Sequence, residues 1–321
     1  ISNIGSIIGT FLAGFVLIPY LGSTNILILI AALLLITALL IFILKHNASS
    51  STIAVVLLVF IGYQGYKNNI EELNYLDFDT QYNRVFIYET EDWYTGKPIK
   101  LMRINNEFSS AMFLDNDSLV FPYSKYFQLH EHFKPDFKKL LVLGGAGYSI
   151  PKHFLKRYPD ALIDVVEIDP MITEIARQEF NLIDNHRLKI YHQDARVYLN
   201  QSEEKYDAIL GDAFKSLFTI PFQLTTLEAT QKMYDLLVDE GLVIQNLHSA
   251  LKGNKSYFLN VIYNTYKQVF PQVYLFKVHE RRESDQIQSV ILIALKSTTK
   301  PSFYNTDPEL NGYLATRFDL P

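Results

Sequence analysis

The sequence predicts a doubly wound α/β domain built on a seven-stranded, mostly parallel sheet. From residue 138 onward, strand and helix patterns alternate, and seven short apolar runs have strand character. Runs such as Ala208–Leu210 are apolar at every position, which is typical of parallel strands that are buried on both faces. Alternation of this kind favours right-handed crossover units that add strands to a single sheet.

The expected elements follow one another with short connections. The strands are Lys139–Gly144, Leu162–Asp169, Leu188–Asp194, Tyr206–Asp212, Gly241–Leu247, Val273–Val278 and Gln288–Leu295. The helices are Pro151–Tyr158, Met171–Phe180, Arg196–Asn200, Leu227–Leu237 and Tyr257–Val269. Because no helical pattern separates the last two strands, the sheet is expected to be mostly rather than wholly parallel.

A small antiparallel β region is expected ahead of this domain. The runs Arg84–Thr90, Ile99–Ile104 and Ser110–Leu114 have strand character and are separated by turn residues. Short strands with such punctuation predict hairpins.

The chain begins with a long uncharged segment, and Lys45 is its first charged residue. Ile4–Leu21 and Ile26–Leu44 each approach the roughly 20 apolar residues that span a bilayer. Gly22–Asn25 between them predicts a turn, and Thr52–Tyr63 is a third, shorter apolar run. We expect two or three transmembrane helices and a lipid bilayer as partner. A signal peptide and a hydrophobic hairpin in a soluble core are the alternatives.

Composition excludes several classes of function. The net charge of -5 and the pI near 5.9 argue against a nucleic-acid partner, which usually requires a basic face. The chain has no cysteine, which excludes disulfides, a thiolate nucleophile and cysteine-based zinc sites. His130 and His132 are close in sequence, but such a pair usually faces solvent. We therefore expect no metal site.

Glycines and an acid follow the first two strands of the expected sheet. Gly144, Gly145 and Gly147 stand after the first strand, where glycine lets a backbone pass close to a ligand. Glu167 ends the second strand, 20 residues after Gly147, at the spacing from which an acid can accept ribose hydroxyls. These four residues predict a nucleoside subsite, although a turn and a surface acid remain alternatives.

Two further acids follow the third and fourth strands. Asp194, followed by Ala195, could accept a hydrogen bond from the amino group of adenine. Asp212 stands at the end of the fourth strand. Ligands of doubly wound sheets bind at the carboxyl ends of the strands, so all these positions belong to one predicted site. The alternative is that both aspartates only cap the helices that follow them.

These motifs resemble the spermidine synthase family. The resemblance rests on Leu141–Gly147, Val166–Pro170, Gln193–Arg196 and Tyr206–Ile209, and it covers roughly residues 80–295. It implies the S-adenosylmethionine methyltransferase-like fold, and the apolar segment is similar to bacterial members that carry fused transmembrane helices. In that family the glutamate at position 167 binds ribose and the aspartate at position 194 binds adenine. The implied co-substrate is S-adenosylmethionine or its decarboxylated form.

The chain departs from the family pattern at three places. The family loop G-G-G-D-G-G has an aspartate at position 147, where this chain has glycine. The family motif D-S-[ST]-D ends in an acid that helps to deprotonate the attacking amine, and this chain has Lys215 there. Tyr126–Gln128 corresponds to Y-[HQ]-E and keeps only the tyrosine. The resemblance therefore assigns catalysis to Asp212 and Tyr126, while the acids that the family has at positions 147 and 215 are lost from the polyamine site.

The resemblance leads to a domain layout and to competing functions. We expect a membrane region at 1–66, a linker at 67–79, the β region at 80–130, the nucleoside-binding domain at 131–298 and a tail at 299–321. Since the chain begins with isoleucine, the membrane region is expected to extend upstream. Because adenosyl sulfonium donors are cytosolic, the α/β domain of this multi-pass protein should face the cytoplasm.

The predicted function is a membrane-tethered transferase that uses an adenosyl sulfonium donor and a small-molecule acceptor. The resemblance implies that this acceptor is an amine. Aminopropyl transfer is the reaction that the resemblance implies. Methyl transfer from S-adenosylmethionine and a non-catalytic nucleoside-binding membrane module are the alternatives. A dehydrogenase is disfavoured, because the G-x-G-x-x-G fingerprint is absent. The sequence leaves open whether the protein forms a homodimer.

Overall fold

The structure, a computed structural model, describes residues 2–45, 59–60, 63, 75–213, 220–279 and 281–320. The chain divides into two compact units, Ile1–Glu89 and Thr90–Pro321.

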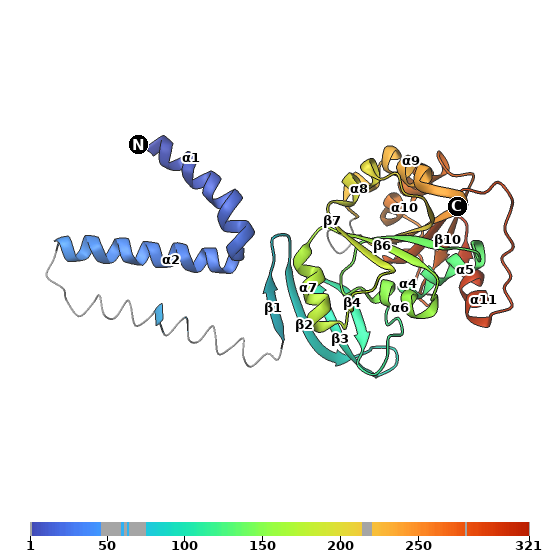
Figure 1. Ribbon diagram of the computed structural model, residues 1–321, viewed down its shortest axis with the longest axis horizontal. Helices are drawn as coiled ribbons and strands as arrows, with labels where there is room; N and C mark the ends of the chain where they lie inside the picture. Colours follow the sequence, from blue (N-terminus) through green and yellow to red (C-terminus); the bar gives the residue numbers. More distant parts are fainter. Residues whose placement is uncertain are drawn as a thin grey trace. The chain divides into compact units, whose positions relative to one another are not determined.

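The N-terminal unit begins with α1 (Ser2–Leu12) and α2 (Ile18–Lys45), which are joined by the π-helical segment Ala13–Leu17 (Figure 1). The turn expected at Gly22–Asn25 is wrong, since α2 continues through these residues. Glycine and asparagine each cost a helix interior only about 1 kcal/mol or less relative to alanine, a cost that the other residues of α2 offset. The break in the helix lies earlier in the chain than the turn chemistry indicated.

The prediction of transmembrane helices is wrong for the described part of residues 1–66. In the part of the chain that the structure describes, none of the helices combines the length with the hydropathy that a bilayer crossing demands. The π-helical segment separates α1 from α2, and α1 with its eleven residues extends only about 16 Å, against the roughly 30 Å of a hydrocarbon core. The multi-pass localisation, with its cytoplasm-facing orientation, is corrected by the same finding. Most of the third run, Thr52–Tyr63, lies outside the described residues.

The expected antiparallel β region is confirmed by two pairs of short strands. In the N-terminal unit, β1 (Leu76–Asp79) pairs with β2 (Arg84–Glu91). In the C-terminal unit, β3 (Pro98–Ile104) pairs with β4 (Glu107–Phe113). Both pairs are antiparallel.

The C-terminal unit contains an eight-stranded sheet in the order β12-β10-β11-β9-β8-β5-β6-β7. Its strands are β5 (Lys139–Leu143), β6 (Leu162–Glu167), β7 (Leu188–His192), β8 (Tyr206–Gly211), β9 (Leu237–Ser249), β10 (Gln272–Lys277), β11 (Gln288–Leu295) and β12 (Arg317–Phe318). The five strands from β9 to β7 are mutually parallel, whereas β11 is antiparallel to both β9 and β10. The seven strands predicted from the sequence are all present.

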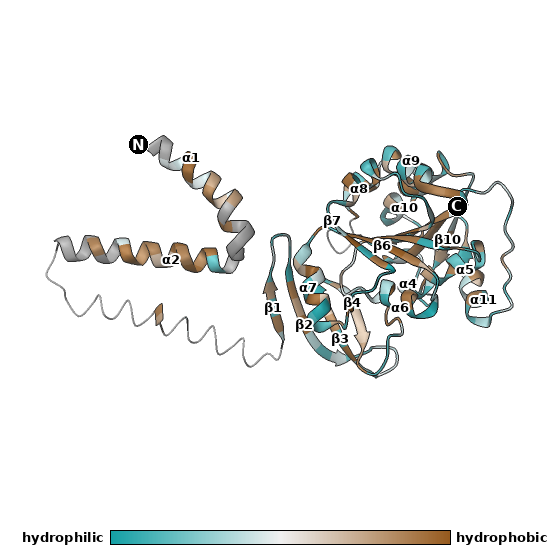
Figure 2. Ribbon diagram, in the orientation of Figure 1, coloured by the Kyte–Doolittle hydropathy of each residue, from teal (hydrophilic) through white to brown (hydrophobic). Residues whose placement is uncertain are grey.

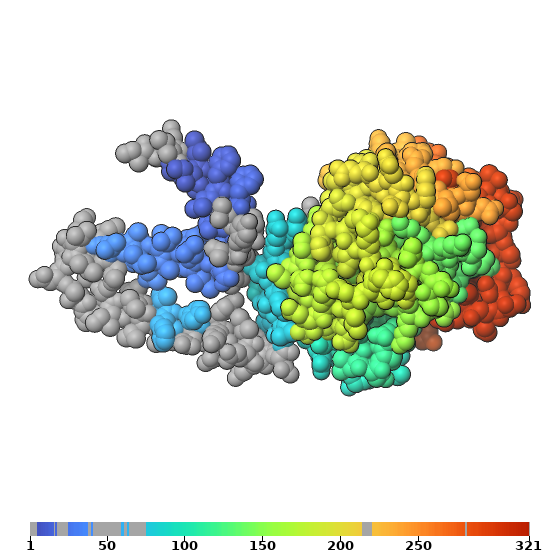
Figure 3. Space-filling model, in the orientation of Figure 1, coloured from blue at the N-terminus to red at the C-terminus, as the bar shows by residue number. Residues whose placement is uncertain are grey.

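The eighth strand comes from the segment expected to be a tail. Residues 299–320 carry α11 (Pro308–Ala315) and β12, and β12 pairs antiparallel with β10. These C-terminal residues, red in Figure 3, lie on the surface of the unit. Their pairing extends the sheet at the β10 edge.

Helices cover both faces of the sheet (Figure 1). The helices are α4 (Pro122–Lys125), α5 (His130–Phe133), α6 (Ser149–Arg157), α7 (Pro170–Glu179), α8 (Ala195–Gln201), α9 (Leu227–Leu236) and α10 (Tyr257–Lys267). One face carries α8, α9 and α10, and the other carries α6 and α7. The central strands are hydrophobic in Figure 2, as expected for strands covered on both sides.

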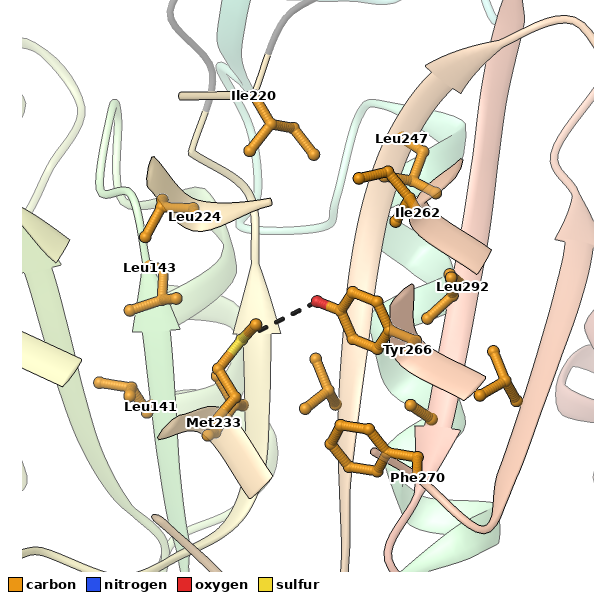
Figure 4. Close-up of a cluster of buried hydrophobic side chains, with 14 of the residues drawn as sticks. Leu141, Leu143, Ile220, Leu224, Met233, Leu247, Ile262, Tyr266, Phe270 and Leu292 are labelled. Atoms are coloured by element: carbon orange, nitrogen blue, oxygen red, sulfur yellow. Dashed lines mark hydrogen bonds between the residues drawn. The ribbon is translucent and has the colours of Figure 1, made fainter. Parts of the chain in front are cut away.

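A hydrophobic core lies under α9 and α10. It includes Leu141 and Leu143 of β5, Met233 of α9 and Tyr266 of α10 (Figure 4). The phenol of Tyr266 contacts the sulfur of Met233 at 3.9 Å. This packing holds β5 and β8 at the centre of the sheet, and the candidate site lies at their carboxyl ends.

Candidate active site

The loop after β5 is shaped by close backbone contacts. Gly144 has φ +98°, and a Cβ there would lie 2.8 Å from the backbone oxygen of Asp212. Gly145 is crossed on one side by the ring of Tyr148, which a Cβ would approach to 2.7 Å. Only glycine therefore fits at either position without a shift of the neighbouring atoms.

Glu167 holds this loop with its carboxylate. Its Oε2 accepts hydrogen bonds from the backbone N–H groups of Gly145 (2.9 Å) and Ala146 (3.3 Å), and its Oε1 accepts from the N–H of Asp169 (3.0 Å). Burial raises the pKa of Glu167, while these three donors act in the opposite direction. The structure thus places Glu167 beside Gly145 and Ala146, where the ends of β6 and β5 meet.

Gly147 has no room beside it for a side chain. A Cβ at this position would lie 2.6 Å from Ser110 Oγ of β4 and 2.8 Å from Cδ1 of Phe180. The aspartate that the family carries here would not fit without rearrangement of this loop. The neighbouring Tyr148 has a positive φ of 55° and is fully buried, and its hydroxyl bonds to Thr173 Oγ1 at 2.7 Å.

Asp194 caps helix α8, and Ala195 is the first residue of that helix. The Oδ1 of Asp194 accepts from the backbone N–H groups of Arg196 (2.6 Å) and Val197 (3.4 Å). Its Oδ2 accepts from Nε2 of Gln223 at 3.1 Å. Asp194 therefore caps α8, and its carboxylate also lies at the carboxyl edge of the sheet with one oxygen outside the cap.

Asp212 forms the polar centre of the site. Its Oδ2 accepts a hydrogen bond from the phenol of Tyr123 (3.0 Å), and its Oδ1 accepts from Nδ2 of Asn246 (3.0 Å). Burial raises the pKa of Asp212 to about 7, although both hydrogen bonds lower it. Burial also raises the pKa of Tyr123 well above its ordinary value, so this phenol remains a donor.

Asn246 leaves one acceptor without a partner. Its side chain is 1% exposed, and its buried Oδ1 has no hydrogen-bond partner among the residues that the structure describes. The Nδ2 contact with Asp212 fixes the orientation of the amide. A buried carbonyl oxygen in this state costs free energy until a donor reaches it.

Tyr126 does not reach Asp212. Its hydroxyl donates to the backbone oxygen of Lys277 (3.0 Å) and lies 3.2 Å from Thr316 Oγ1, and its ring packs on Tyr313. The tyrosine that contacts Asp212 is Tyr123, three residues earlier. The sequence analysis did not identify Tyr123 or Asn246 as site residues. The one signal near Tyr123 is Pro122, a residue type that favours the first position of a helix and so marks the start of α4. Lys215 lies outside the described residues.

No group of three or more histidine, aspartate or glutamate side chains in the described ranges is arranged to hold a metal ion.

Comparison with known proteins identifies the family. The profile of the spermine/spermidine synthase domain matches residues 124–296, which is more than half of the chain. The chain belongs to the spermine/spermidine synthase family. The match includes the loop after β5 and the site residues at the ends of β6 and β8.

Two relatives have different activities. The chain is 31% identical over 180 residues to the polyamine aminopropyltransferase of Vibrio vulnificus, covering 54% of this chain and 57% of that enzyme. It is 26% identical over 155 residues to the eEF1A lysine and N-terminal methyltransferase of Xenopus laevis, covering 44% of this chain and 21% of that protein. The chain thus spans only part of the length of these curated relatives.

Two solved structures share the fold. A probable spermidine synthase from Corynebacterium glutamicum superposes with a TM-score of 0.62 and 21% identity, covering 74% of this chain and 85% of the other. A spermidine synthase in complex with the transition-state analogue AdoDATO superposes with a TM-score of 0.56 and 17% identity, covering 74% and 84%. The predicted methyltransferase-like α/β fold is confirmed.

Proposed function

We propose that this chain transfers an aminopropyl group from decarboxylated S-adenosylmethionine to an amine. The observation that carries the proposal is the Asp212 carboxylate, held between Tyr123 and Asn246 with the Asn246 Oδ1 unsatisfied. A carboxylate beside a free amide oxygen offers two acceptors, which suits a group with more than one N–H. An amine nitrogen has this property, whereas a hydroxyl or a thiol has one hydrogen at most.

The residues at the strand ends fit the nucleoside part of such a donor. Gly144 brings the loop backbone close to Asp212, and Glu167 and Asp194 supply carboxylates at the ends of β6 and β7. We assign Glu167 to the ribose hydroxyls and Asp194 to the adenine amino group. When bound, the donor supplies an electrophilic carbon next to its sulfonium.

The chain's own contribution is to orient the amine and to take up its proton. With a pKa of about 7, Asp212 exists partly as the anion at neutral pH and can accept a proton from the attacking amine. The amine nitrogen forms the new C–N bond, the C–S bond breaks toward the sulfur, and the released proton goes to Asp212. Tyr123 and Asn246 hold the carboxylate in place during this transfer.

Methyl transfer is the second candidate, and Gly147 favours it. The resemblance assigns the aspartate at this position to the amine of the decarboxylated donor, and here Ser110 and Phe180 occupy the space that such a side chain needs. A site without that acid loses one reason to prefer decarboxylated over intact S-adenosylmethionine. The Xenopus methyltransferase relative agrees with this alternative.

Product detection by mass spectrometry distinguishes the two. The full chain is incubated with either donor and with putrescine, spermidine or a longer polyamine as acceptor, and D212N serves as the inactive control. We expect aminopropylated product from the decarboxylated donor alone. A methylated product from intact S-adenosylmethionine would establish the second candidate, and neither product, with nucleoside binding intact, would contradict both.

A further inference from the structure

The side chain of Gln223 donates a hydrogen bond to the Asp194 oxygen that would otherwise accept one from a ligand. Gln223 lies in the 3-10 helix Phe222–Leu224, and its Nε2 donates to Asp194 Oδ2 at 3.1 Å. The other oxygen of Asp194 is already committed to the N-terminus of α8 through two backbone N–H groups. The contact therefore uses the oxygen that the helix cap leaves available.

The hydrogen-bonding group of Gln223 resembles the one proposed for the ligand. A primary amide and the exocyclic amine of adenine each present a planar nitrogen with two hydrogens to a carboxylate. Both bonds would be charge-assisted, so an exchange between them is close to balanced in free energy. The amide of Gln223 is thus a chemical stand-in for the adenine amino group.

The backbone around Gln223 is anchored independently of this contact. Nη1 of Arg196 donates to the backbone oxygen of Gln223 (3.2 Å) and to Thr226 Oγ1 (3.1 Å). Thr226 in turn caps helix α9 through the N–H of Ala229. Because Gln223 is only half-buried, its side chain can rotate into water while the backbone keeps its position.

We infer that Gln223 competes with the adenine amino group for Asp194 and must release the carboxylate when a nucleoside binds. The inference rests on the proposed nucleoside function and adds a residue that weakens affinity for adenine. A base without a 6-amino group gains nothing from Asp194 and so does not need the release. Gln223 therefore sets how much binding energy the amino group contributes.

Calorimetry on the full chain tests the inference with two ligands, 5′-methylthioadenosine and its analogue that lacks the 6-amino group. Gln223→Met keeps the length of the side chain and removes the donor, and Gln223→Ala is the second variant. Gln231→Met is the matched control, because Gln231 bonds only to Asp235 on the exposed side of α9. Circular dichroism verifies that each variant is folded.

We expect both Gln223 variants to bind methylthioadenosine roughly ten-fold more tightly, the scale of one charge-assisted hydrogen bond that no longer has to be broken. The analogue should bind with equal affinity to native protein, Q223M and Q231M. Unchanged or weaker binding of methylthioadenosine by Q223M would overturn the inference and leave Gln223 as a support for Asp194. No binding by the native chain would refute the nucleoside site itself.

Discussion

The phenol of Tyr123 donates to the Asp212 carboxylate at 3.0 Å, across 89 residues of sequence. Tyr123 lies in the short helix α4 and Asp212 follows β8, so the contact joins α4 to the end of a central strand of the sheet. The other carboxylate oxygen of Asp212, Oδ1, accepts a hydrogen bond from Nδ2 of Asn246 at 3.0 Å. Two side chains from separate elements, Tyr123 and Asn246, thus set the position and the acidity of Asp212.

Loss of the carboxylate should stop the reaction. Asp212→Asn removes the proton acceptor and should lower kcat by about 10²- to 10⁴-fold, the usual contribution of a general base. Tyr123→Phe should lower kcat less, because the carboxylate remains. Initial rates with the donor and acceptor that give product provide the measurement.

Tyr126→Phe is the matched control for Tyr123→Phe. The hydroxyl of Tyr126 bonds to Lys277 and Thr316 rather than to Asp212, so its removal should affect stability by about 1 kcal/mol and leave kcat unchanged. A large loss of kcat in Tyr126→Phe with native activity in Tyr123→Phe would restore Tyr126 as the catalytic tyrosine.

The rate should rise with pH through about 7. The raised pKa means that Asp212 is mostly protonated below this value and cannot accept a proton from the amine. Since the hydrogen bond from Tyr123 lowers the pKa of Asp212, Tyr123→Phe should move the midpoint of kcat/KM to higher pH. A midpoint that stays in place in this variant would show that another group controls the profile.

Gly147→Ala should destabilise the C-terminal unit. The added Cβ would lie 2.6 Å from Ser110 Oγ and 2.8 Å from a ring carbon of Phe180, so the loop or β4 has to shift. Overpacking of this kind costs about 1–3 kcal/mol, measurable as a lower free energy of unfolding in urea. Gly312→Ala in α11 is the control, because no atom lies within 4 Å of its added Cβ. It should be neutral or slightly stabilising.

Buried His130 should make the protein sensitive to acid. Its ring lies among Phe137, Phe154 and Tyr158, and burial lowers its pKa to about 4. The unfolded chain binds this proton near pH 6.5 and the folded chain only near 4, so stability is full above pH 6.5 and falls as the pH drops toward 4. Urea unfolding between pH 7 and pH 5 measures the loss.

His130→Phe removes the titrating group and should flatten this pH dependence, at a cost near neutral pH from the lost Nδ1 contact with the backbone oxygen of Phe127. An equally steep dependence in the variant would assign the acid sensitivity to other groups.

The amino-acid sequence alone determined the α/β architecture and the positions of its acids. Apolar runs and helical periodicity are local properties, and parallel strands end at one edge, so Glu167, Asp194 and Asp212 were assigned to one site before their contacts were known. The same local reasoning took an uncharged run for transmembrane helices and placed a turn at Gly22–Asn25, whereas the structure has a π-helical segment at Ala13–Leu17 and a continuous helix through the expected turn.

Only the tertiary structure decided which side chains complete the site. Tyr123 and Tyr126 are about one helical turn apart. Tyr126 packs on Tyr313, and Tyr123 is the tyrosine that donates a hydrogen bond to Asp212. The crowding of Gly147 by Ser110 and the bond from Gln223 to Asp194 also join distant segments. Such contacts depend on how elements pack in space, and periodicity along the chain carries no information about them.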